Sequence, residues 1–185
     1  MSRRIPRLEF EQLAPPLQEQ LAARVKRLGY LGEFFKCAGH QPALLGPFMT
    51  MTEAFKKVLP ERLVEVGALT VAGVMKNEYE RNQHERLSFR LGFGKDWIAE
   101  VNRLDPDRAA QMSDAEKAVQ RFAIALIERK GGGVDAELDA MIDAIGPEAA
   151  MAVMFLVGRY VTHAFIVNAL ALAPPVKSVF VEEPR

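Results

Sequence analysis

The sequence has a single cysteine, Cys37, among its 185 residues. One thiol excludes an intrachain disulfide, a Cys-x-x-Cys redox centre and a cysteine-rich zinc site. The chain also lacks a net charge, because 24 lysines and arginines balance 24 aspartates and glutamates. This balance removes the usual electrostatic attraction to nucleic acid or to an anionic membrane surface, so we expect neither as a partner. It leaves self-association unopposed by charge repulsion.

Membrane-targeting signals are also missing from the sequence. The N-terminus is basic, but no apolar run follows it, so we predict no signal peptide. The most apolar stretch, from Ala149 to Ala173, is interrupted by Arg159, Tyr160 and His163. These polar side chains favour a core or interface helix over a membrane span. We therefore predict a soluble, cytoplasmic protein.

Strand patterns are scarce, and helical periodicity runs through most of the chain. We predict an all-α fold in one domain, residues 1–185, with a core of about 37–174, an N-terminal helical arm and a short C-terminal tail. The composition, 49% hydrophobic, suits such a core. The expected helices are Leu8–Leu28 with a break at Pro15–Pro16, Ala43–Val58, Glu61–Lys76, Asn77–Leu91, Asp96–Arg103, Asp114–Ile127, Asp135–Ile145 and Pro147–Leu172.

The helix expected at 61–76 is apolar on all sides, which is typical of a central, buried helix. Glu65 is the exception in its middle. A buried carboxylate is costly unless a cation or a hydrogen-bond donor faces it. The sequence therefore predicts a partner for Glu65, and proton transfer in a small pocket is a function that would retain it.

The next helix carries three polar residues on one face. Asn77, Glu80 and His84 follow one another at i, i+3 and i+7, so they fall within roughly 60° on a helix of 100° per residue. Glu80 and His84 are four residues apart and can pair directly. We expect this face to point inward. The residues expected to face solvent or a neighbouring subunit are Glu78, Arg81, Glu85 and Arg86.

A histidine with buried carboxylate partners can move protons near neutral pH, so Glu65, Glu80 and His84 are the candidate catalytic residues. A purely structural pair between buried helices is the main alternative. A metal site is a weaker one, because the sharper ligand motifs are absent, and we predict neither a metal nor a cofactor. Asn77, Tyr79, Tyr160 and His163 are candidate substrate-binding residues, although Tyr79 is expected to lie away from the Glu80–His84 face.

Two segments resemble the carboxymuconolactone decarboxylase-like superfamily, which includes the AhpD-type alkylhydroperoxidases. They are Leu59-Pro60-Glu61-Arg62-Leu63-Val64-Glu65 and Asn77-Glu78-Tyr79-Glu80-Arg81-Asn82-Gln83-His84, followed by Leu91-Gly92-Phe93. The likeness extends loosely from about residue 37 to 174. It implies an AhpD-like helical bundle that assembles as trimers or hexamers, with a pocket between helices and no redox cofactor.

The same resemblance separates two activities. In the peroxidase branch two cysteines stand where this chain has Asn77 and Glu80, so peroxidase activity is not expected. The decarboxylase branch is closer, and it implies that His84 is the general acid/base, Glu80 its partner and Glu65 a second relay or an orienting group. The substrate would be a small carboxylated or lactone-type molecule. Its carboxylate calls for a cation, which Arg81 or Arg159 supplies only if packing turns it inward. A non-catalytic, oligomeric ligand-binding protein of the same fold is the alternative.

Overall fold

The computed structural model describes residues 5–181, and within that range the chain is helical without a strand. The helices are α1 (Pro15–Leu28), α2 (Glu33–Ala38), α3 (Pro42–Val58), α4 (Glu61–Val74), α5 (Glu78–Arg90), α6 (Lys95–Arg103), α7 (Asp114–Glu128), α8 (Asp135–Ile145) and α9 (Pro147–Ala169). Short 3-10 helices lie at η1 (Phe10–Gln12) and η2 (Pro106–Arg108). The all-α prediction is confirmed.

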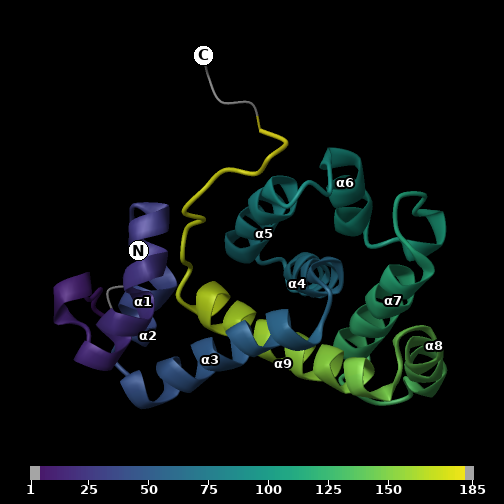
Figure 1. Cartoon of the computed structure of the whole chain (residues 1–185), viewed down its shortest axis with the longest axis horizontal. Helices are drawn as coiled ribbons and strands as arrows, with labels where there is room; N and C mark the ends of the chain where they lie inside the picture. The colour runs from purple at the N-terminus through teal and green to yellow at the C-terminus, as the bar shows by residue number, and fades with distance from the viewer. Residues whose placement is uncertain (1–4, 182–185) are drawn as a thin grey trace.

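Helix α4 lies at the centre of the molecule, where Figure 1 views it nearly end-on. It packs against α5, α6, α7 and α9, and every residue from Leu63 to Ala72 is buried. Its close contact with α9 depends on Gly67, because a Cβ atom there would clash with a methyl carbon of Leu156. The apolar pattern around this helix thus predicted its burial correctly.

Helices α1, α2 and α3 form a second apolar cluster beside this core. Leu21, Phe34 and Leu45 belong to it, and Tyr79 of α5 and Val167 of α9 complete it. Helix α2 was not expected from the sequence, since its six residues are too few to display a period. Figure 1 shows α3 and α9 lying alongside one another below α4, and helices α3 and α9 are in contact.

Among residues 5–181, α9 is the one helix long and apolar enough to cross a membrane, by length and composition alone. Half of its most apolar window is buried inside the protein, against α3, α4 and α8. The core helix of a globular protein meets the same criteria.

Candidate functional site

The structure brings Glu65, Glu80 and His84 into direct contact. Glu65 lies on α4, and the other two lie one turn apart on α5, which packs against α4. His84 Nδ1 is 2.9 Å from Glu65 Oε2, and His84 Nε2 is 3.1 Å from Glu80 Oε2. The imidazole therefore bridges two carboxylates, both almost fully buried.

A second histidine extends this arrangement from α9. His163 Nε2 lies 3.2 Å from the other oxygen of Glu80, Oε1. At the opposite end, Ser88 Oγ donates to Glu65 Oε2 over 3.1 Å. We call this series of side chains the Glu–His chain; its members in order are Ser88, Glu65, His84, Glu80 and His163. It joins α4, α5 and α9 through the interior.

His84 and Glu80 are held in their charged forms. Burial alone would lower the pKa of His84, but the Tyr160 hydroxyl and the Glu65 and Glu80 carboxylates hold it well above its usual range. Both ring nitrogens face carboxylate oxygens, so both donate. Burial would raise the pKa of Glu80, yet His163, His84 and Arg159 around it hold that pKa well below its usual range.

His163 is in the opposite protonation state. Burial, helped by the nearby cations Arg159 and His84, lowers its pKa to about 4 despite the favourable effect of Glu80. It is therefore neutral near pH 7. The Glu80 oxygen 3.2 Å from Nε2 favours the tautomer with the proton on that nitrogen, which leaves a lone pair on Nδ1. That nitrogen is buried and has no hydrogen-bond partner among the described residues. The unused lone pair can accept a hydrogen bond or a proton from a bound molecule, and the lowered pKa makes this imidazole a weaker base than an exposed histidine.

Arg159 lies one turn before His163 on α9 and is turned inward, with 7% of its surface exposed. Its Nε donates to Thr52 Oγ1 over 2.9 Å. The guanidinium stacks between the rings of Phe48 and Tyr160, at 4.5 and 4.4 Å from their centroids. Its Nη1 is buried without a hydrogen-bond partner in the part of the chain that the structure describes. The inward cation that the sequence left open is thus present.

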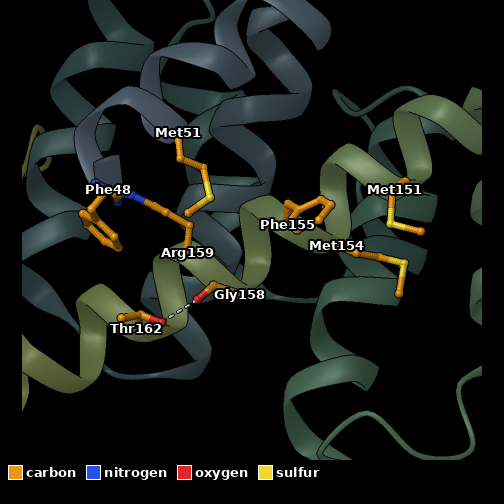
Figure 2. A pocket seen from close by; sticks show the side chains of 8 residues that line it. All are labelled: Phe48, Met51, Met151, Met154, Phe155, Gly158, Arg159 and Thr162. Atoms are coloured by element: carbon orange, nitrogen blue, oxygen red, sulfur yellow. Dashed lines mark hydrogen bonds between the residues drawn. The ribbon is translucent and has the colours of Figure 1, made fainter. Parts of the chain in front are cut away.

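Figure 2 shows this arginine at one end of a surface pocket of about 470 Å³ between α3 and α9. Arg159 extends from α9 toward α3, where Phe48 and Met51 lie beside it. Met151 and Phe155 precede Arg159 on α9 and are exposed. The pocket therefore has an apolar, methionine-rich wall with one cation at its end.

The remaining candidates support the Glu–His chain from three sides. Asn77 caps α5, since its Oδ1 accepts from the backbone N–H of Glu80 over 3.2 Å. The edge of the Tyr160 ring meets His84, with 5.2 Å between ring centroids. The ring centroid of Tyr79 lies 6.0 Å from that of His163, and the Tyr79 hydroxyl accepts a hydrogen bond from the backbone N–H of Phe34.

One expectation about α5 was wrong. Glu85, expected to face solvent or a neighbouring subunit, is 2% exposed. Asn102 of α6 and Ser178 of the C-terminal segment donate to its two oxygens, and the backbone N–H of Val179 joins them. The physical reason is tertiary, because segments distant in sequence cover both sides of the helix.

Solved structures with the same arrangement of helices are known. A variant of the debrominase Bmp8, in complex with 2,3,4-tribromopyrrole, has a TM-score of 0.81 at 16% identity, over 94% of this chain and 92% of that one. The alkylhydroperoxidase AhpD core of an uncharacterized peroxidase-related protein from Ralstonia eutropha JMP134 has a TM-score of 0.80 at 14% identity, over 92% of this chain and 91% of that one. The peroxidase-related protein from Silicibacter sp. TM1040 has 0.74 at 14% identity, over 94% and 95%.

The chain has the AhpD-like fold. No family model and no curated protein matches the sequence, so the likeness lies in the fold alone. Within this AhpD-like fold, the positions that the resemblance assigns to two cysteines hold Asn77 and Glu80, and both serve the Glu–His chain. The single thiol, Cys37, is buried in α2.

Sequence reasoning missed two members of the site. Ser88 stands four residues after His84, and this spacing was a usable signal. Thr52 lies 107 residues before Arg159 and carried none. Within residues 5–181, no three side chains of His, Cys, Asp or Glu converge as a metal site would require. The Glu–His chain is linear, and both nitrogens of His84 are already hydrogen-bonded to carboxylates.

Proposed function

We propose that the protein is an acid–base enzyme that transfers a proton at a carbon atom of a small carboxylated or lactone-type molecule, without thiol chemistry. The observation that carries this proposal is the Glu–His chain, which ends on the buried, unpartnered Nδ1 of His163. In this proposal the lone pair of the neutral His163 takes a proton during the reaction. The Glu80 carboxylate beside its other nitrogen favours the imidazolium, and the pKa of about 4 makes that imidazolium an acid strong enough to return the proton readily.

In this proposal the two histidines have different roles. His84 uses both nitrogens within the chain, so it holds positive charge between Glu65 and Glu80 rather than touching the substrate. His163 is the group that meets the reacting carbon. The sequence-based role of His84 as the general acid/base thus passes to His163, and His84 becomes a positioning residue that sets the charge of Glu80.

Arg159 is the proposed anchor for the substrate carboxylate or lactone carbonyl. Its buried Nη1–H groups lack an acceptor, and a carboxylate supplies one while neutralising the charge. When the carbon bears a carboxylate, the proposed reaction is decarboxylase-like. The bond to the carboxylate breaks, carbon dioxide leaves, and the electron pair that stays on carbon takes a proton that His163 relays from solvent.

The AhpD-like fold also holds a small organic ring in at least one other protein, the debrominase Bmp8 with 2,3,4-tribromopyrrole. We further propose that copies of this chain associate. Met151, Phe155 and Phe165 project from α9 with more than half of their surface exposed, and apolar groups in such positions are typical of contact surfaces.

The test is proton exchange and carbon dioxide release in heavy water, followed by NMR with a panel of oxo acids and unsaturated lactone acids. The wild type should exchange or decarboxylate at least one of them. His163→Gln keeps a donor for Glu80 but removes the base, and should slow turnover by about 100-fold or more. Arg159→Gln should weaken substrate binding, while Arg121→Gln, an exposed arginine paired with Asp107, is the matched control.

Two outcomes would refute the proposal. Turnover that survives in His163→Gln removes that residue from the chemistry. Failure of the wild type on every carboxylate and lactone in the panel, with His163→Gln changing only thermal stability, favours a ligand-binding protein in which the Glu–His chain is structural.

A further inference from the structure

A second, more apolar pocket lies between α2, α3 and α9, with a volume of about 600 Å³. Volumes of this size are typical of sites for small organic ligands. Its wall is mostly hydrocarbon, and Ile5 and Pro6 close one side. Its other lining residues include Phe34, Cys37, Ala38, Phe48, Ile166 and Leu170.

This pocket borders the end of the Glu–His chain. Phe34 and Phe48 form part of its wall, and the same two rings contact His163, with centroid distances of 4.1 and 6.5 Å. Phe48 also covers the Arg159 guanidinium. His163 and Arg159, which carry two of the buried polar atoms without partners among the described residues, do not line the pocket themselves, but each has as a neighbour at least one ring of its wall.

We infer that this pocket holds the apolar body of the substrate, so that the substrate is an amphiphilic carboxylic acid with an aliphatic chain or aryl group. The inference rests on the proposed function, which places the acid head at Arg159 and the reacting carbon at His163. A short polar acid leaves most of the apolar wall in contact with water, whereas a longer chain removes that area from water at about 25 cal/mol per Å².

Cys37 provides a readout that does not depend on turnover. It is the chain's one cysteine and it lines this pocket. Burial raises the pKa of its thiol, so alkylation is slow and is limited by access. We would measure the rate of alkylation by N-ethylmaleimide with and without decanoic acid, and with butyric acid as the short comparison.

Decanoic acid at ten times its dissociation constant should slow the reaction of Cys37 about tenfold, because only the free protein reacts. Butyric acid at the same concentration should leave the rate unchanged. Equal protection by the two acids, or none by either, would overturn the inference. This comparison uses the wild-type protein and so needs no variant to fold.

The second measurement is ligand binding by a variant in which a larger side chain fills the pocket. Ala38→Phe places a ring within the pocket, and Ala136→Phe places the same ring on the exposed face of α8 as the matched control. Calorimetric binding of decanoic acid should be lost in the first and kept in the second. Binding that persists in Ala38→Phe refutes the inference that the acid binds in this pocket.

The two proposals fail separately. Protection of Cys37 by decanoic acid without turnover of any acid supports the pocket and counts against the enzyme. Turnover that requires His163 but has the same KM in Ala38→Phe supports the enzyme and overturns the pocket.

Discussion

Because of the two histidines of the Glu–His chain, His84 and His163, we predict that the free energy of unfolding is greatest near pH 6.5. His163 has a folded pKa of about 4, below its ordinary value of 6.5. As the pH falls below 6.5, the unfolded chain takes up a proton at this residue and the folded chain does not, so the native state loses stability. Each pH unit costs about 1.4 kcal/mol, so the loss approaches about 3 kcal/mol at pH 4.

His84 acts with the opposite sign and in a different range. Its folded pKa lies well above 6.5, so its stabilising effect is fully present below 6.5 and is lost as the pH rises toward the folded value. Below pH 6.5 it is protonated in both states and contributes no slope. The acid side of the maximum therefore reports on His163 and the alkaline side on His84.

The assay is urea unfolding, followed by circular dichroism between pH 4.5 and 8.5. We expect the wild type to lose about 2 kcal/mol between pH 6.5 and 5, and His163→Gln to lose much less, because glutamine donates to Glu80 without titrating. His40→Gln, at an exposed histidine, is the matched control. An unchanged wild-type free energy over this range, or the same acid loss in His163→Gln, would refute the reasoning.

Three further predictions concern stability and assembly. Glu80→Gln should lower the free energy of unfolding by about 3 kcal/mol at pH 6.5, since the negative charge that two imidazoles face is removed. Glu100→Gln, the control, should lower it by about 1 kcal/mol. Equal losses of unfolding free energy for the two variants in urea titrations would contradict this. Gly67→Ala should cost about 1–3 kcal/mol, because its Cβ meets Leu156, and an unchanged melting temperature would argue against that packing. If copies associate as proposed, Phe155→Glu should dissociate them in sedimentation velocity, and a monomeric wild type would rule out self-association.

Much of the fold was predictable because local signals and periodicity agreed. Ser113 forms a reciprocal cap with Glu116 at the start of α7, and the turn glycine Gly146 precedes α9. The α4 pattern predicted burial on all sides, and the structure has it. Most helix boundaries shifted by one to three residues, as at Asn77, which caps α5 from outside the helix, and at the end of α9, which is Ala169 rather than Leu172.

The candidate site was predictable only in part. The spacing of Glu80 and His84 fixed their pairing, since side chains four residues apart on a helix meet. The orientation of α9 had no such signal. Its sequence is apolar on nearly every side, so periodicity does not reveal that Arg159 is turned inward or that His163 faces Glu80.

By itself, then, the sequence determined the helices, the burial of Glu65 and the pairing of Glu80 with His84, because each depends on residues within a few turns. Tertiary structure decided which histidine has a free nitrogen. That outcome depends on α9 meeting α5, so that Glu80 binds both imidazoles and leaves the Nδ1 of His163 without a partner. Contacts between residues 80 and 163 arise from packing of distant helices, which no local pattern encodes.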